Sequence, residues 1–544
     1  MRLENLSLFF KNNWKWLALF FIALLVINPI GEFALNDDWM YSMAVRNLLQ
    51  GKGLLIPALA SPTLVCHIAW GSICSLLLGA SYSALRMSTL AMAFLALVWI
   101  SLLAGARKNA QEPLALSPAF LLAGNPLFLL LSFTFMTDVP YLSWMLLALW
   151  LYSRAFETDA ATDWLAASSA AALAYLTRQT ALAVMAAVLL TMLLRRRADA
   201  KRLLLAFAVP VAAIAAYTLW FNFFHGGNWA AKIYLAHQSR AFIFDYRNYG
   251  EIALRFAAIL FYAGFFASPL AFFLPVKREG RLGVLVAVGA VAALLVAVKG
   301  LPPYYCSIIT PSGFGYLSLV GEKSGGFFGS GIFWLFAVAL SVWAWIAFCR
   351  NWRGFAQGRA AFLVTAAFFH SLMSPVLLYL YDRYVLAVFA PFLAAVAIVA
   401  RENGTFTRAR AIAASSVGAL FFIWALAGTW DYMNWNRARM DLTRAAVAYG
   451  IPDDGIDNGV EGYAGAIYER NMALLQSKLP PEKITPLDWI NINDFRAFIA
   501  YSRMDSPRWT LLAERSYFSP LICASGKLYL YVLPPGSHFH VTHY

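Results

Sequence analysis

Charged residues are scarce in this 544-residue chain. Asp, Glu, Lys and Arg make up 13% of the sequence, whereas 61% of the residues are hydrophobic and the mean hydropathy is +0.63. A typical soluble domain carries about 25% charged residues. This shortage excludes an ordinary soluble globular protein and predicts a polytopic membrane protein whose main partner is the lipid bilayer.

Acidic residues are scarcer than basic ones, with 28 Asp and Glu against 42 Lys and Arg and a formal net charge of +14. In a soluble chain such an excess would favour nucleic acid as a partner. Here the basic residues fall in short clusters between apolar runs, as in the cytoplasmic loops of membrane proteins. We therefore expect no nucleic-acid partner.

Two further absences concern cysteine and a signal peptide. The five cysteines show no CxxC spacing or regular framework, so no metal or redox motif follows from them. The first apolar run, 16–30, ends at Asn-Pro-Ile-Gly-Glu without the small residues of a cleavage site. Because Arg2, Lys11 and Lys15 precede it, we interpret this run as an uncleaved span with the N-terminus in the cytoplasm.

Three apolar runs, 63–79, 87–105 and 114–133, separate Asp38 from Asp138. If all three crossed the membrane, Asp138 would face the cytoplasm and Arg107-Lys108 would face outward, against the positive-inside rule. The first run is barely as long as the ~20 residues that a ~30 Å hydrocarbon core requires, and it is rich in polar residues. We predict that it is a juxtamembrane or re-entrant helix in the first outer loop, so that Asp37 and Asp138 share the outer face.

Together with the run 16–30 and the runs 87–105 and 114–133, the remaining apolar runs predict an all-α membrane domain over residues 1–429, with about thirteen transmembrane helices in total. The further spans are expected near residues 139–156, 163–177, 180–194, 203–223, 252–274, 281–299, 329–349, 359–374, 384–400 and 409–429. After residue 430 charged residues and turn signals recur, and residues 527–533 alternate like a strand. We expect residues 430–544 to form a small α/β domain outside the membrane, in the periplasm. The closing His538, His540 and His543 are candidate metal ligands, but their spacing is more typical of an incidental polar tail.

Carboxylates mark the outer face at two places: the pair Asp37-Asp38 directly after the first span, and Asp138. Ionisable groups near a bilayer are costly and are therefore functional candidates. A helix beginning at Asn36, a favourable N-cap, would place Asp37 and Tyr41 one above the other. The pair either complements the helix dipole or forms an active site, and the third carboxylate favours the active site. Paired carboxylates suit general-base activation of a hydroxyl, or alternatively bind a divalent cation.

These residues carry a resemblance to the C-type glycosyltransferases that use polyprenyl-phosphate sugars, the group of protein O-mannosyltransferases and bacterial lipid A aminoarabinose transferases. Their first-loop motif is similar to Asp37-Asp38-Trp39-Met40-Tyr41, followed by Arg46 and Leu48-Leu49-Gln50-Gly51. Asp37 occupies the position of the family's catalytic Asp, and Asp38 replaces its usual Glu with a shorter reach. Further family segments resemble Asp138, Leu176-Thr177-Arg178-Gln179-Thr180 and Asp382-Arg383-Tyr384-Val385-Leu386.

The resemblance and the chemistry of a lipid phosphate assign roles to these residues. Arg offers a rigid bidentate fork for phosphate, and Arg178 and Arg383 lie at predicted outer span ends, where interfacial anchoring is the alternative role. For Arg46, the alternative role is an ion pair with the acidic residues. We predict that the catalytic residues are Asp37, Asp38 and Asp138, and that the residues binding lipid phosphate or substrate are Arg46, Arg178, Arg383 and Tyr41.

The resemblance implies an inverting glycosyltransferase of the bacterial plasma membrane. It would move a sugar from a polyprenyl-phosphate donor to an acceptor hydroxyl of the cell envelope, on a glycan, lipid or protein, with no cofactor beyond an optional divalent cation at the acidic pair. Two other classes stay open: a lipid-linked glycan flippase or transporter, and an O-antigen-type ligase or polymerase. A flippase would place its charges deep within helices and a ligase in a late outer loop, whereas the marked residues here come early and at outer span ends.

Overall fold

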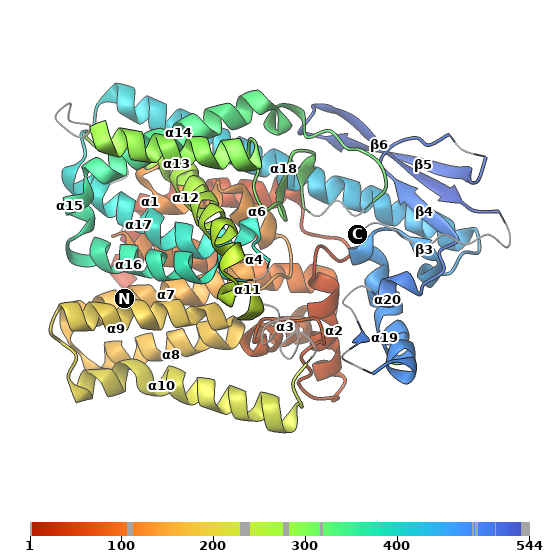
Figure 1. Ribbon diagram of the computed structural model, residues 1–544, viewed down its shortest axis with the longest axis horizontal. Helices are drawn as coiled ribbons and strands as arrows, with labels where there is room; N and C mark the ends of the chain where they lie inside the picture. Colours follow the sequence, from red (N-terminus) through yellow and green to blue (C-terminus); the bar gives the residue numbers. More distant parts are fainter. Residues whose placement is uncertain are drawn as a thin grey trace.

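The computed structural model describes residues 3–105, 112–228, 240–275, 282–315, 319–377, 379–480, 483–484, 488–505 and 507–534. Most of these residues form helices that run along the long axis of the molecule, with a small sheet at one end (Figure 1). The predicted polytopic helical architecture is confirmed. The candidate cytoplasmic residues Arg107-Lys108 and the terminal histidines His538, His540 and His543 lie outside the described residues.

Seven helical stretches within the described residues are long and apolar enough to cross a membrane. They comprise α1 (Leu3–Ile27), α4 (Tyr82–Leu103), α10 (Ala200–Leu219) with the π-turn Trp220–Phe224, α12 (Tyr249–Ala271), α14 (Gly331–Arg350), α17 (Val385–Asn403) and α18 (Arg408–Ala448). Five more helices occupy predicted spans: α7 (Asp138–Thr158), α8 (Ala161–Thr177), α9 (Leu182–Leu194), α13 (Leu282–Lys299) and α16 (Gly358–Met373). The total of about thirteen spans stays a prediction.

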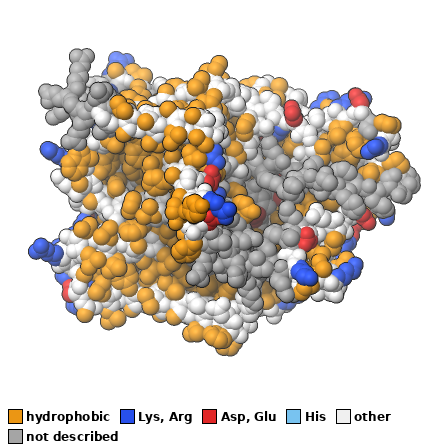
Figure 2. Space-filling view, in the orientation of Figure 1, with side chains coloured by type: hydrophobic (Ala, Val, Ile, Leu, Met, Phe, Trp, Pro, Cys, Tyr) orange, Lys and Arg blue, Asp and Glu red, His pale blue; other side chains and the backbone are white. Residues whose placement is uncertain are grey.

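The surface of the helical part agrees with a lipid environment. Hydrophobic side chains cover most of the helical part of the face in Figure 2, and the charged side chains lie mainly toward the two ends of the molecule, apart from one group near the middle. Only 11% of the apolar stretch of α10 is buried inside the protein. An apolar helix that is exposed to this degree is stable only where lipid covers it.

The predicted continuous span 114–133 is wrong. The chain here forms a 3-10 turn (Leu114–Leu116) and two short helices, α5 (Pro118–Ala123) and α6 (Pro126–Ser132). The break lies at Asn125-Pro126, because a residue before proline is disfavoured in the helical conformation while proline suits the first helical position. The Asn125 side chain accepts hydrogen bonds from the N–H groups of Leu127 and Phe128, at 2.9 and 3.1 Å. This cap satisfies the freed backbone groups, so the break is tolerated in the interior.

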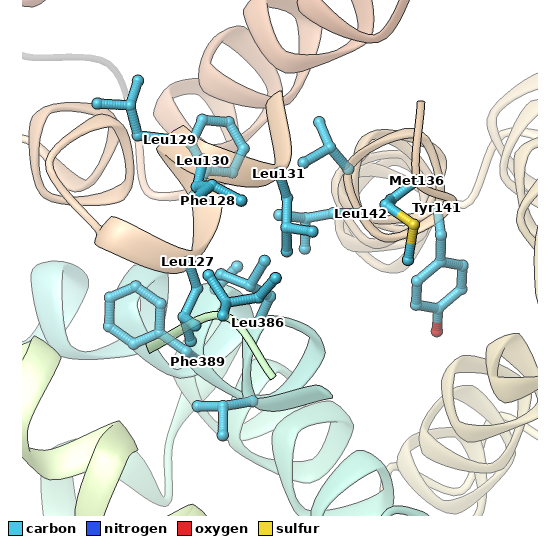
Figure 3. Packing of buried hydrophobic residues seen from close by; sticks show 14 of the residues in the cluster. Leu127, Phe128, Leu129, Leu130, Leu131, Met136, Tyr141, Leu142, Leu386 and Phe389 are labelled. Carbon is cyan, nitrogen blue, oxygen red and sulfur yellow. The ribbon is translucent and has the colours of Figure 1, made fainter. Parts of the chain in front are cut away.

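The segment α6 lies at the centre of the apolar core. Its residues are fully buried, and Figure 3 shows Leu127 beside Leu386 and Phe389 of α17. The helix also packs against α18 and α7. The residues that follow it, up to Asp138, are therefore anchored to a rigid part of the protein.

Basic loops meet at one end of the helices. Arg401, at the end of α17, donates to the carbonyls of Ala104 and Gly105 after α4, both at 2.7 Å. At the same end, Arg359 pairs with Glu157 at 2.7 Å. These contacts bring together the basic ends of neighbouring helices. The positive-inside rule places such basic helix ends on the cytoplasmic side.

Beyond the opposite ends of the α7–α10 helices lie α2 (Asp38–Leu49) and α3 (Val65–Leu78), with the sheet farther along the molecule (Figure 1). The 14-residue α3 packs against α2, α4 and α8, and it is too short to cross a bilayer upright. This arrangement agrees with the predicted juxtamembrane or re-entrant helix. Asp37, Asp138 and the C-terminal sheet consequently lie on the same side of these helices (Figure 1).

The C-terminal part begins without a break, because α18 is a single helix of 41 residues that crosses position 430. Its strands form a sheet in the order β3-β4-β6-β5, in which only β3 and β4 are parallel. The alternating residues 527–533 fall largely in β6, as predicted. The elements are α19 (Val460–Lys478), α20 (Asp488–Asn491), β3 (Ile456–Asp457), β4 (Ala497–Ala500), β5 (Thr510–Ser519) and β6 (Ala524–Val532).

Shorter elements complete the chain: α11 (Arg240–Phe244), α15 (Trp352–Phe355), and the hairpin β1 (Ile309–Thr310) and β2 (Gly313–Phe314). Just beyond this hairpin, Val320 forms a bridge with Ala500 at the end of β4. The boundary between 429 and 430 stays a prediction, since the change in composition there falls inside a helix.

Candidate active site

Asp37 is the N-cap of α2, one residue later than predicted. Asn36 has a φ of +53°, a left-handed conformation in which a helix does not begin. The Tyr41 N–H still donates to the main-chain carbonyl of Asp37 at 3.3 Å, so the expected i, i+4 relation is present. The Asp37 side chain caps no N–H of the helix. It is 42% exposed, and its Oδ2 lies 3.5 Å from Nη2 of Arg383.

Asp38 points in another direction, because consecutive residues of a helix are turned by about 100° from each other. Its side chain is fully buried, and Oδ1 accepts a hydrogen bond from the N–H of Phe135 at 2.8 Å. Burial raises the pKa of this carboxyl to about 8, despite the Phe135 hydrogen bond and the nearby Arg86, which lower it. Asp38 therefore holds the segment before Asp138 against α2.

The elevated pKa predicts how stability depends on pH. The folded protein keeps a proton on Asp38 between pH ~4 and pH ~8 that the unfolded chain, with a pKa of ~3.9, has lost. Stability from this group is therefore complete below pH ~4 and disappears as the pH rises through ~8. Asp38→Asn should flatten this part of the profile, as measured by melting temperature in detergent between pH 5 and pH 9. Profiles of equal slope in both proteins would show that Asp38 is ionised when folded.

Phe135 connects the two acidic segments. Besides its hydrogen bond to Asp38, its carbonyl lies 3.0 Å from Nε2 of His67 on α3, and the two rings stack at 4.1 Å. Gly71 leaves the space for this ring, since a Cβ there would lie 2.4 Å from the ring of Phe135. The sequence around the second acidic site is thus fixed by α2 and α3 together.

Asp138 is the first residue of α7, and it is nearly buried. Its Oδ1 accepts a hydrogen bond from Nη1 of Arg178 at 2.5 Å. Arg178 follows the last residue of α8, where the helix ends and the backbone becomes extended. The pair holds the arginine in a fixed orientation and leaves its other N–H groups for further partners.

Arg383 lies in the 3-10 turn Asp382–Tyr384 that leads into α17. This turn is fixed by Asp382, which accepts hydrogen bonds from the N–H groups of Ile308 and Ile309. The guanidinium of Arg383 lies 5.7 Å from the centre of the Tyr384 ring, and that of Arg178 lies 5.1 Å from the same ring. One aromatic ring therefore contacts both cations, an arrangement that is favourable for each.

A pocket brings these groups together. Asp138, Arg178 and Arg383 line it, although up to 245 positions separate them in the sequence. Its remaining lining residues are Tyr141, Thr180, His370, Met373, Ser374, Leu377, Tyr384, Leu386 and Ala387. The pocket combines two cations and a paired carboxylate with apolar walls, which suits an anionic head attached to an apolar chain.

The other predicted residues differ in their placement. Tyr41 is buried, and Asp37, Arg383, Arg178 and Asp138 all act electrostatically on its hydroxyl. Burial also raises the pKa of Tyr41 above its usual range. Arg46 is exposed in the last turn of α2, and no ion pair joins it to a described acidic residue. The structure thus brings Tyr41 to the site and leaves Arg46 at its periphery.

Two pocket residues were missed by sequence reasoning. The Tyr141 hydroxyl lies 2.7 Å from Nε2 of His370, whose Nδ1 is 2.9 Å from the carbonyl of Ala366. Figure 3 shows the Tyr141 ring pointing away from the neighbouring leucines. A polar residue such as His370 within an apolar span was the only available signal, and no spacing linked it to Tyr141.

A metal site needs several ligands at one place. Across the described ranges, no three His, Cys, Asp or Glu side chains cluster closely enough to hold an ion. Asp37 and Asp38, the candidate ligand pair, face Arg383 and the Phe135 backbone respectively.

Comparisons with known proteins bear on part of the chain. Residues 62–221 match the family described as dolichyl-phosphate-mannose-protein mannosyltransferase, which confirms the resemblance to polyprenyl-phosphate-dependent glycosyltransferases over this segment. The segment contains Asp138 and Arg178, whereas Asp37 and Arg383 lie outside it. No curated protein matches the chain.

Two crystal structures are similar to this chain at low identity. ArnT from Cupriavidus metallidurans bound to undecaprenyl phosphate is 12% identical with a TM-score of 0.41, covering 88% of this chain and 72% of that one. The apo state of the same protein is 16% identical with a TM-score of 0.41, covering 86% of this chain and 73% of that one.

Proposed function

We propose, starting from the family match of residues 62–221, that this chain is an integral-membrane glycosyltransferase that uses a polyprenyl-phosphate sugar as donor. The observation that carries the proposal is the convergence of Asp138, Arg178 and Arg383 on one pocket, with Asp37 beside Arg383. A phosphate needs charge-assisted N–H donors, and an acceptor hydroxyl needs a nearby base. The site offers both within one end of the helical bundle.

The roles follow from the contacts of each group. Asp37 is the exposed carboxylate and acts as the base that deprotonates or aligns the acceptor hydroxyl. Arg178 and Arg383 bind the phosphate and stabilise the charge that develops on it as the sugar departs. Asp138 fixes Arg178 and Asp38 fixes the segment before Asp138, so these two predicted catalytic carboxylates act as positioning residues.

Attack of the acceptor oxygen on the sugar carbon proceeds with inversion in this proposal. The new glycosidic bond forms as the bond between sugar carbon and phosphate oxygen breaks, the acceptor proton passes to Asp37, and the lipid phosphate leaves as an anion. The acceptor belongs to the cell envelope. The protein lies in the bacterial plasma membrane, with α2, α3 and the C-terminal sheet on the periplasmic side and the N-terminus in the cytoplasm.

The proposed orientation predicts the outcome of cysteine labelling. In a background in which the five native cysteines are replaced, single cysteines at Lys52 and Asp505 should react with an impermeant thiol reagent added from outside, whereas one at Arg350 should react only after permeabilisation. Labelling of Arg350→Cys from outside, with Lys52→Cys protected, would show that the protein has the opposite orientation in the membrane.

The donor and acceptor are tested by incubating membranes that contain the protein with a panel of radiolabelled polyprenyl-phosphate sugars and identifying the labelled product. We expect one class of sugar to appear on an envelope acceptor in membranes with the wild-type protein. Membranes with the Asp37→Asn variant provide the matched control, and equal labelling in both would contradict the proposal.

A further inference from the structure

The loop between α1 and α2 is held by arginines from distant parts of the chain. Arg86 on α4 is fully buried and donates to the main-chain carbonyls of Pro29 and Gly31, at 3.1 and 2.6 Å, and also to that of Phe33. Its guanidinium packs over the Phe33 ring at 4.3 Å. A planar guanidinium with five donors is suited to binding several carbonyls at once.

Two more arginines reach the same loop from the part of α18 that lies beyond the predicted membrane span. Arg437 donates to the carbonyls of Ile27, at 3.1 Å, and Asn28. Arg439 donates to the carbonyl of Ala34 at 3.2 Å. Together the three arginines bind six main-chain carbonyls between Ile27 and Ala34. Ala34 lies three residues before Asp37.

Arg439 also contacts the part of the C-terminal region that follows α18. It is fully buried, and its Nη1 lies 3.1 Å from the carbonyl of Asn458 and 3.1 Å from Oε1 of Glu461 on α19. One guanidinium therefore joins α18, α19 and the loop that precedes the acidic pair. A buried ion pair of this kind often adds no net stability compared with well-packed apolar residues.

The C-terminal domain contacts the acidic pair from its other side as well. Trp39, the residue after Asp38, packs against Tyr468 of α19 and Trp489 of α20, with ring centres 5.1 and 5.7 Å apart. The backbone around Asp37 is thus fixed both before and after the carboxylate. The phosphate-binding arginines have separate supports, since Arg178 is held by Asp138 and the Arg383 turn by Asp382.

We propose that Arg439 is a positioning residue for Asp37, through which the C-terminal domain sets the place of the base relative to the donor pocket. The inference rests on the proposed function, in which Asp37 acts on the acceptor hydroxyl. A displacement of about 1 Å at a reacting group costs about 10²-fold in rate. Loss of the Arg439 contacts should therefore slow transfer while donor affinity is preserved.

The test compares Arg439→Lys with Arg401→Lys. Arg401 is a matched control because it also binds main-chain carbonyls and pairs with a carboxylate, Glu112 at 3.7 Å, but at the opposite end of the helices. Lysine keeps the charge and loses the fork. The measurements are melting temperature, donor affinity, transfer rate and hydrogen exchange of the peptide covering residues 28–41.

We expect Arg439→Lys to slow transfer about 10²-fold and to speed exchange in residues 28–41, with donor affinity unchanged. Arg401→Lys should leave both the transfer rate and the exchange in residues 28–41 unchanged. If Arg439→Lys folds poorly, the double variant Arg439→Met with Glu461→Leu replaces the buried pair by apolar groups, which proteins often tolerate, and should show the same two effects.

Two results would overturn the inference. Equal slowing in both lysine variants would show that the loss of transfer follows a general loss of stability. Unchanged exchange in residues 28–41 would show that Arg439 does not hold the loop. A wild-type protein that transfers no sugar from any donor would instead contradict the proposed function. The exchange comparison does not depend on activity, so it still decides whether Arg439 holds the loop.

Discussion

Replacing Asp37 by Asn is expected to reduce sugar transfer by about 10²–10⁴-fold, the range typical for loss of a general base, while donor binding persists. Asn keeps the size and most of the hydrogen bonding of the side chain and removes the proton acceptor. The carboxylate lies 3.5 Å from Arg383 and caps no N–H group of α2, so its loss leaves the helix intact. Single-turnover transfer and donor affinity, measured on the same preparation, check both halves of the prediction.

Asp38→Asn serves as the control for Asp37→Asn. Asp38 faces the Phe135 backbone, so its variant should retain most activity and change mainly the dependence of stability on pH. If Asp37→Asn kept near-normal turnover, Asp37 would be better explained as a residue that complements the dipole of α2.

Removing the guanidinium of Arg383 is expected to weaken donor binding by about 1.5–3 kcal/mol, the usual contribution of a charged hydrogen bond. Arg383→Lys should restore only part of this affinity, since an ammonium lacks the bidentate fork. The side chain is largely buried and lines the pocket, and its turn is held independently by Asp382. Affinity for polyprenyl phosphate, measured in detergent for the wild type, Ala and Lys variants, tests this prediction.

Arg178 needs a different variant, because Arg178→Ala would leave the buried Asp138 carboxylate without its partner. Breaking a buried pair in this way typically costs 3–5 kcal/mol of stability. The double variant Arg178→Met with Asp138→Leu removes both charges of the pair at once. No unpaired buried charge is then left, so the measured change reports on donor binding and not on stability. If lysine fully replaces one of the arginines in donor binding, with any loss confined to melting temperature, that arginine would be an interfacial anchor.

Local patterns predicted much of the helical architecture. Apolar runs place α4, α7, α10, α12, α14 and α17 within a few residues of their observed ends, because a lipid-exposed or buried span must be apolar along its length. The charge rule also predicted that Asp37 and Asp138 share one end. The run 114–133 was misjudged because hydropathy does not register the preference of Asn125-Pro126 for a helix start.

Convergence of the site could be predicted only in part. Motif order brought Asp37, Asp138, Arg178 and Arg383 to one face, but the direction of each side chain is a tertiary property. Asp38 turns inward because Phe135 offers it an N–H group, and the Tyr141–His370 contact joins residues 229 positions apart. The role of α18 beyond residue 430 was equally hidden, since Arg439 meets Ala34 only after the whole chain has folded.

The proposed chemistry is tested most directly by following the fate of the donor on purified protein in lipid vesicles. Mass analysis of vesicles supplied with the active polyprenyl-phosphate sugar and its acceptor should show glycosylated acceptor and free polyprenyl phosphate in equal amounts with the wild type. Both products should be almost absent with Asp37→Asn. Movement of an intact lipid-linked sugar across the bilayer, with no free lipid phosphate formed, would contradict the account and identify a transporter.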